Sequence, residues 1–128
     1  MFKLIKIEGG RINVYEPQIL PVGDSAVKSG EALVLASGKL KRCEPNVVPT
    51  FIAIADAAAN TEVAVGRVES NQLYEVNASE APTSLAVGNK VTISDDGLGV
   101  TKTTASGVAE IVNLNGATAI GDTLVVRF

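Results

Sequence analysis

A chain of 128 residues is long enough for one domain of ordinary size and leaves no room for a second. Apolar residues make up 46% of the sequence and charged residues 20%, which indicates a folded chain and excludes a disordered one. The formal net charge is −3 with acidic and basic residues interspersed, so the sequence lacks the Lys/Arg stripe that nucleic-acid binding requires.

We expect neither a membrane-spanning segment nor an export signal in this sequence. No run of about 18 apolar residues occurs, so we expect no transmembrane helix and no membrane partner. Segment 1–10, MFKLIKIEGG, is too short and too interrupted by charge for a secretory signal, which favours synthesis in the cytoplasm. Because Cys43 is the single cysteine, an internal disulfide is excluded.

The apolar residues are of a kind that favours a sheet. The chain holds 17 Val and 9 Ile but only 3 Phe, 2 Tyr and no Trp. β-Branched side chains fit the pleated, half-buried surface of a sheet, so the composition predicts an all-β domain with a thin core. Since few large aromatics add to such a core, contacts with other copies or with a docking surface could supply further stability.

Short strand-like runs alternate with turn residues along the whole chain. In chain order these runs are 2–7, 11–16, 31–36, 39–43, 50–55, 61–69, 72–76, 90–94, 98–103, 107–114 and 123–128. Pro17 and Pro21 exclude the segment after the second run from the centre of a sheet, because proline cannot donate to a strand ladder. Three hairpins are predicted at the turn signals Ser37-Gly38, Ser70-Asn71 and Asp95-Asp96-Gly97.

Two segments carry helical signals. Residues 56–60, DAAAN, favour one helical turn with Asp56 as its N-cap, and the loop at 77–84 could hold a second. The predicted fold is therefore all-β, a small antiparallel β-barrel or sandwich with one or two short helical turns. We expect an N-terminal extended segment or arm at 1–22 and a single β domain at 23–128.

One short phrase occurs three times, as Val-Gly-Asp at 22–24, Val-Gly-Asn at 87–89 and Ile-Gly-Asp at 120–122. Glycine allows backbone angles that are closed to other residues, and Asp or Asn can accept hydrogen bonds from nearby backbone N–H groups. The three copies are unevenly spaced and do not mark a solenoid repeat. We therefore interpret the phrase as a sharp turn before a strand, with a structural role.

The residues that enzymes use most often for proton transfer are missing. The chain has no histidine, which removes the commonest general base, the Ser-His and Cys-His pairs and the usual zinc ligands. Cys43 follows Arg42 but has no base partner, so we expect a small buried side chain. Segment 94–99, SDDGLG, lacks the alternating acidic ligands of a calcium loop and is interpreted as a turn. The sequence predicts no enzyme, no catalytic residue, no cofactor and no metal site.

Segment 30–76 resembles the core of the decoration, or cement, proteins on the heads of tailed bacteriophages. In the lambda-like decoration protein family, a hairpin similar to ALVLASGKL at 32–40 leads through a connector to an alternating strand that ends in Ala-Asp. Ile54-Ala55-Asp56 and the second hairpin at 61–76 fill those positions here. The ending TAIGDTLVVRF at 118–128 is similar to phage cement proteins outside the lambda-like group.

This resemblance implies a β-tulip or a related barrel. It also implies a virion protein on the capsid exterior that binds the major capsid protein, often as a homotrimer, and stabilises the shell against internal DNA pressure. No nucleic acid, membrane or cofactor is expected as a partner.

The N-terminal segment is where a binding role competes with a structural one. Phe2, Leu4, Ile5 and Ile7 place apolar groups on both faces of a strand. This segment is either an arm that adds to a partner's sheet edge or a set of edge strands of the same body. The expected contacts with the capsid or a neighbouring subunit are made by Phe2, Leu4, Ile7 and Tyr15.

Two other functions fit the same composition. A tail or baseplate β-domain of a phage is the first alternative. The second is a small non-enzymatic β-barrel that binds a ligand such as a carbohydrate. Sugar sites usually stack on exposed aromatic rings, and Tyr15 and Tyr74 are the only tyrosines, which weakens the second alternative.

Overall fold

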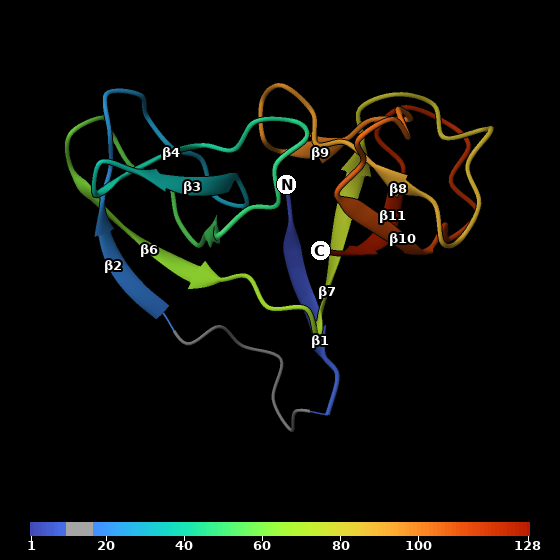
Figure 1. Cartoon of the computed structure of the whole chain (residues 1–128), viewed down its shortest axis with the longest axis horizontal. Helices are drawn as coiled ribbons and strands as arrows, with labels where there is room; N and C mark the ends of the chain where they lie inside the picture. Colours follow the sequence, from blue (N-terminus) through green and yellow to red (C-terminus); the bar gives the residue numbers. More distant parts are fainter. Residues whose placement is uncertain (10–16) are drawn as a thin grey trace.

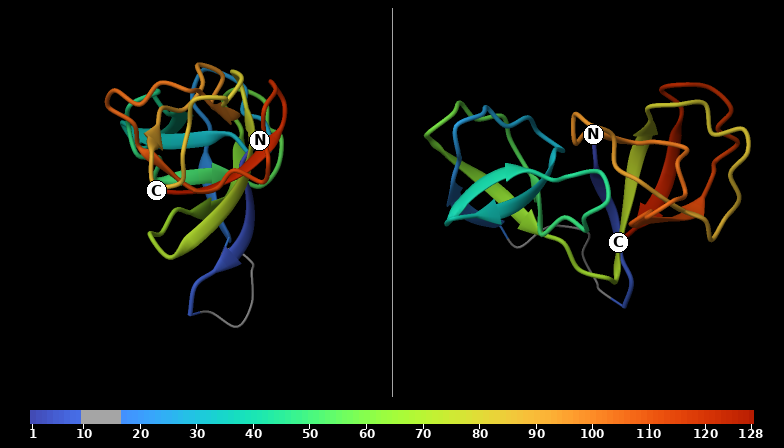
Figure 2. Two further views of the ribbon diagram at one scale, coloured as in Figure 1. Left: turned by 90° about the vertical axis from the view of Figure 1, so that its right-hand side faces the viewer. Right: turned by 45° about the horizontal axis from the view of Figure 1, so that its top comes forward.

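The computed structural model describes residues 1–9 and 17–128, which form two lobes, each built around one β-sheet (Figure 1). The right-hand view of Figure 2 also shows the lobes side by side, with both chain ends near the junction between them. The predicted strand at 11–16 and Tyr15 lie outside the described residues. The all-β fold expected from the sequence is confirmed in the described part of the chain.

The larger sheet has the strand order β1-β7-β11-β10-β8, with β9 paired to β7. Its strands are β1 (Lys3–Ile7), β7 (Gln72–Ala78), β8 (Lys90–Val91), β9 (Gly99–Val100), β10 (Ala109–Asn113) and β11 (Thr123–Arg127). Neighbours along the main order are antiparallel, whereas β9 runs parallel to β7. We call the lobe around this sheet the six-stranded lobe.

The other sheet has the order β2-β6-β5-β3-β4, and all its neighbours are antiparallel. Its strands are β2 (Pro17–Pro21), β3 (Ala32–Ala36), β4 (Lys39–Arg42), β5 (Phe51–Ala53) and β6 (Glu62–Arg67). The proline-bounded β2 lies at the edge of the sheet, as the missing N–H groups of Pro17 and Pro21 require. We call this half of the molecule the five-stranded lobe.

No helix occurs in residues 1–9 or 17–128, so the predicted helical turns are wrong for this part of the chain. Asp56, the predicted N-cap, instead accepts a hydrogen bond from the Ser29 backbone N–H at 2.7 Å. Ala57 pairs with Val27 in an isolated antiparallel bridge, which commits this backbone to an extended partner. The described residues accordingly contain no helix that is long and apolar enough to cross a membrane.

Described parts of the N-terminal segment 1–22 belong to both sheets. β1 pairs with β7, with Lys3 opposite Glu75 and Leu4 opposite Tyr74, and β2 pairs with β6. Both strands of this segment, β1 and β2, are therefore edge strands of the two sheets, as the second of the two interpretations expects. The division of the chain at residue 22 stays a prediction, because strand pairing does not show which part folds alone.

Side-chain alternation in the five-stranded sheet contributes to two hydrophobic cores. Phe51 and Leu33 point into the core of their own lobe. Their neighbours Ile52 and Ala32 point the other way, into the core of the six-stranded lobe. The predicted alternation of Phe51 against Ile52 is thereby confirmed. One face of the five-stranded sheet thus helps to close the core of the other lobe.

Three aromatic rings gather in the core of the six-stranded lobe. The ring of Tyr74 on β7 lies edge-on to Phe2, with centroids 6.4 Å apart, and 5.7 Å from Phe128. Phe2 and Phe128, which come from opposite ends of the chain, are 5.5 Å apart. Phe2 and Tyr74 are 2% and 0% exposed. This cluster therefore joins β1 and the segment after β11 to β7, an interior strand of the sheet.

Replacing Phe2 by Ala is expected to lower the free energy of unfolding by about 3–5 kcal/mol, because the buried ring leaves a cavity between Tyr74 and Phe128. Chemical denaturation followed by tyrosine fluorescence or circular dichroism measures this change. Val87→Ala is the matched control, since Val87 is 63% exposed and its truncation should change stability by no more than about 0.5 kcal/mol. Equal effects of the two substitutions would contradict the placement of Phe2 in the core.

Candidate functional site

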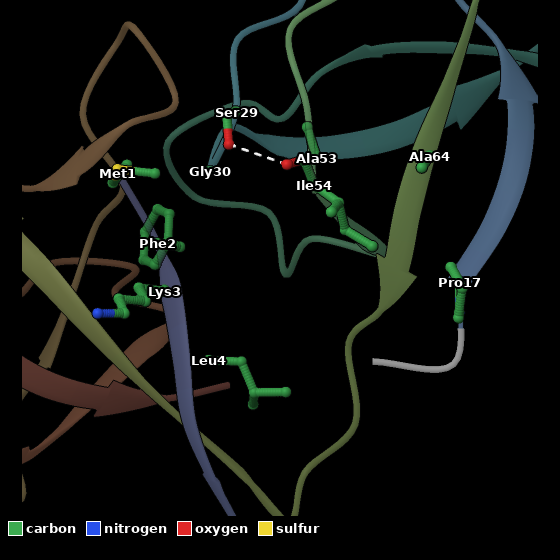
Figure 3. A pocket seen from close by; sticks show the side chains of 10 residues that line it. All are labelled: Met1, Phe2, Lys3, Leu4, Pro17, Ser29, Gly30, Ala53, Ile54 and Ala64. Carbon is green, nitrogen blue, oxygen red and sulfur yellow. Dashed lines mark hydrogen bonds between the residues drawn. The ribbon is translucent and has the colours of Figure 1, made fainter. Parts of the chain in front are cut away.

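An apolar groove of about 460 Å³ lies between β1 and the five-stranded sheet (Figure 3). On one side, Leu4 of β1 faces the groove. On the other side lie Ile54, just after β5, Ala64 of β6 and Pro17 of β2. Lys3 is the charged side chain among the described residues of its lining. A concave, mainly apolar surface with few polar groups is the usual form of a binding site.

Backbone hydrogen bonds hold β1 against the five-stranded lobe at one end of the groove. The Phe2 N–H donates to the Gly30 carbonyl at 2.9 Å, and the Gly30 N–H donates to the Ala53 carbonyl at 2.8 Å. Gly30 has a φ of +78°, and a Cβ atom there would collide with the Cβ of Met1. Glycine is therefore required at this position, both for the backbone angle and because the segment at Met1 and Phe2 approaches it so closely.

Sheet register builds the opposite wall. The Ile54 N–H donates to the Ala64 carbonyl at 2.9 Å, and the Ser29 hydroxyl donates to the Ile54 carbonyl at 3.1 Å (Figure 3). Ile19 on β2 lies opposite Ala64, which continues the same face of the sheet beyond the groove. Ile54 is 40% exposed and Ile19 is 63% exposed. This face therefore presents apolar side chains to solvent next to the groove.

The four residues predicted to contact the capsid or a neighbouring subunit do not share one environment. Phe2 lines the inner end of the groove, but its ring is enclosed in the core. Leu4 is half-buried and faces the groove, whereas Ile7 is half-buried on β1 opposite Gln72. Tyr15 lies outside the described residues. Their role as capsid or subunit contacts stays a prediction, and Leu4 is the described member that is best placed for it.

Sequence reasoning did not assign the wall formed by Ile54 and Ala64. A signal for Ile54 was present, because the alternation in 50–55 places Ile52 and Ile54 on the same face. Only the tertiary structure separates them, since Ile52 is covered by the six-stranded lobe and Ile54 extends past that cover.

Two copies of the repeated Gly-Asp/Asn phrase adopt the predicted turn. Gly88 and Gly121 have φ angles of +92° and +89°. Asn89 accepts a hydrogen bond from the Ala86 N–H at 2.9 Å. Asp122 accepts two at 2.9 Å from the backbone N–H groups of 118 and 119, and these bonds lower the pKa of its carboxyl. These contacts confirm the predicted hydrogen-bonding role of the Asp and Asn side chains in the second and third copies.

The first copy is a turn of another kind. Gly23 does not lie in the left-handed region, so the predicted backbone reason for this glycine is wrong. A Cβ atom at Gly23 would instead lie 2.8 Å from the Leu40 carbonyl oxygen, which accepts the Gly23 N–H at 2.9 Å. Close approach of two backbones, rather than the φ angle, requires glycine here.

Cys43 is a buried side chain, as predicted, with 2% of its surface exposed. Its thiol donates to the Val47 carbonyl at 3.0 Å. Burial raises the pKa of the Cys43 thiol from 9.0 to about 11, and the Glu44 carboxylate adds to this effect. The thiol is therefore protonated at neutral pH and is a poor nucleophile.

Segment 94–99 is a tight turn, as its sequence predicts. Asp96 accepts hydrogen bonds from the Ser94 hydroxyl at 2.6 Å and from the Leu98 N–H at 3.0 Å, and the Ser94 bond is the main cause of the lowered pKa of Asp96. Gly97 has a φ of +71°. Over residues 1–9 and 17–128, no group of three or more His, Cys, Asp or Glu side chains is arranged to hold a metal ion.

Alkylation of Cys43 with iodoacetamide at about pH 8 should be far slower in the folded protein than in the unfolded chain, because burial both covers the sulfur and favours the neutral thiol. The rate in the folded protein is expected to rise between pH 9.0 and about 11 as the thiolate forms. Mass spectrometry of timed samples, with and without guanidinium, measures both rates. Similar rates in the two states would show that the thiol is accessible.

No protein-family model matches this chain, and no curated protein matches it. Among solved structures, the chain is similar to the N base of head fiber gp8.5 in bacteriophage phi29, with a TM-score of 0.60 and 16% sequence identity. The similarity covers 88% of this chain and 93% of that chain. At this identity the comparison shows a shared fold, and its coverage extends over both lobes.

Proposed function

We propose that this chain is a structural protein of a phage head, which binds the outside of the capsid shell and stabilises it as decoration proteins do. The observation that carries the proposal is the fold shared with a phage head fiber base over nearly the whole of both chains. The resemblance of segment 30–76 to lambda-like decoration proteins supports the same role from the sequence through its hairpin at 32–40 and the strand that ends at Asp56. The predicted second hairpin at 61–76 is wrong, because β6 belongs to the five-stranded sheet and β7 to the six-stranded sheet.

In this proposal the chain acts through binding alone and not as an enzyme. Its partner is the major capsid protein, and a homotrimer at local three-fold positions of the shell is the proposed assembly. Each copy that binds the assembled lattice, and not the separated subunits, shifts the equilibrium toward the assembled shell by mass action. Many copies of modest affinity can therefore stabilise a large shell without cofactor, nucleic acid or membrane.

The apolar groove is the proposed contact surface. The N–H of Phe2 points away from β7, toward Gly30. Because both backbone polar groups of a strand residue point to one side and alternate along the strand, those of Leu4 also point away from β7, toward the groove. An extended segment of the capsid protein could add to this edge of β1, with apolar side chains against Leu4 and Ile54. Backbone hydrogen bonds would then give affinity and the apolar wall would give selectivity.

Co-sedimentation with assembled capsid shells that lack this protein tests the function. Saturable binding at a fixed ratio to capsid subunits, with a raised temperature of shell disruption, is the expected result. Binding without any stabilisation would contradict the cement role and leave attachment to the head. No binding to immature or expanded shells would overturn the proposal in favour of a tail or baseplate component.

Ile54→Asp should weaken shell binding strongly, because it places a charge in the apolar wall of the groove. Ile120→Asp is the matched control, since Ile120 is 71% exposed on a turn outside the groove lining. Circular dichroism checks that both variants are folded before their saturation curves are compared. Parent-like binding by Ile54→Asp, or an equal loss in both variants, would exclude the groove as the contact surface.

A further inference from the structure

Glu31 carries a buried carboxylate, only 1% exposed, at the end of the turn that leads into β3. One carboxylate oxygen accepts the Arg42 Nε–H at 2.8 Å, and the other accepts the Lys28 backbone N–H at 2.9 Å. The Arg42 side chain is 47% exposed, so the pair lies at the boundary between core and solvent. A buried carboxylate is costly unless it is paired in this way, and such pairs often fix geometry rather than add stability.

The hairpin tip of the other lobe meets this ion pair. The Gly97 carbonyl accepts the Ala32 N–H at 2.8 Å, and the Asp95 carbonyl lies 3.5 Å from Nη1 of Arg42. A Cβ atom at Gly97 would lie 3.0 Å from Cγ of Glu31 and 3.2 Å from Cγ of Arg42. Gly97 therefore packs against the aliphatic parts of both side chains, and no larger residue fits without displacing them.

We propose that Glu31, Arg42 and the hairpin tip at 95–97 form an interlobe latch that fixes the orientation of the two lobes. Apolar contacts across the junction are strong but non-directional, so they allow sliding and rocking. Charge-assisted hydrogen bonds have defined angles and distances, and a close-packed glycine tolerates little displacement. The latch adds a directional constraint to the shared core at a second place, beside the backbone hydrogen bond from Phe2 to Gly30.

The latch is also continuous with the groove. Glu31 holds the 28–31 turn through the Lys28 N–H, and the same turn contributes Ser29 and Gly30 to the groove lining. The Gly30 carbonyl in turn accepts the hydrogen bond from the Phe2 N–H, which lies on the β1 side of the groove. Loosening the latch should therefore change the separation of the groove walls, whichever partner the groove binds. This inference does not depend on the proposed capsid role.

The test measures the distance between spin labels on the two lobes by pulsed electron paramagnetic resonance. Lys39→Cys places a label on the exposed start of β4, and Ala105→Cys places one on an exposed loop of the six-stranded lobe. Mass spectrometry verifies that buried Cys43 stays unlabelled. Against this background, Glu31→Gln removes the charge with little change of shape, and Gly97→Ala pushes the hairpin tip away from the ion pair.

Each variant has a matched control. Glu110→Gln removes the acid of the Arg127–Glu110 pair, whose atoms are 3.4 Å apart between neighbouring strands of one sheet. Gly116→Ala carries the same backbone strain as Gly97→Ala, since its φ is +73°, but a Cβ there has no atom within 4 Å. The controls separate loss of the latch from loss of any ion pair and from strain at a left-handed glycine.

The expected result is a broadened or shifted distance distribution in Glu31→Gln and Gly97→Ala and a parent-like distribution in both controls. Distributions that stay parent-like in the two latch variants would overturn the proposal, as would equal broadening in the controls. If Glu31→Gln does not fold, the same distance measurement is made on Arg42→Lys instead. This substitution keeps the positive charge on a half-exposed side chain but loses the Nε donor, and it should broaden the distribution as well.

Discussion

The closure of one core by residues from both lobes is the constraint on which the rest of the structure depends. Tyr74 on β7 of the larger sheet contacts Phe2 and Phe128, and Ala32 and Ile52 of the smaller sheet belong to the same core. With so few aromatic residues in the chain, this cluster holds most of its ring surface. Neither lobe can therefore separate from the other without exposing buried side chains of this shared core.

The groove follows from the same packing. β1 must place Phe2 in the shared core, and Gly30 lets it approach the five-stranded lobe closely enough to do so. Beyond Phe2 the strand diverges from that lobe, and Leu4 then faces Ile54 across a gap instead of packing on it (Figure 3). Phe2 thus closes the core, and Leu4, two residues later, borders the open groove. This arrangement couples the stability of the fold to the shape of its candidate binding site.

The polar residues at the junction complement the apolar ones. Glu31 and Arg42 are the buried and half-exposed members of an ion pair that packs on the turn at Gly97. Such a pair contributes little net stability compared with the ring cluster, because its desolvation offsets its attraction. What the pair contributes is a fixed orientation of one lobe relative to the other. A protein that contacts a regular lattice with both lobes would require such a fixed angle.

The sequence by itself determined the fold class, the exclusion of 17–22 from the centre of a sheet, the alternation around Phe51 and the turns at Gly88, Gly97 and Gly121, because these depend on local backbone preference and on the period of side-chain direction. Only the tertiary structure decided that Phe2 is enclosed while Ile54 is exposed, that 56–60 is extended through the Ala57 bridge with Val27, and that Gly23 is needed for contact with Leu40. These features depend on which distant segment covers a residue, and local patterns carry no information about that cover. The candidate site lies next to the residues that the six-stranded lobe buries, at the point where the sheet becomes exposed at Ile54. The sequence therefore indicated some of the apolar residues of the site but not where the site lies.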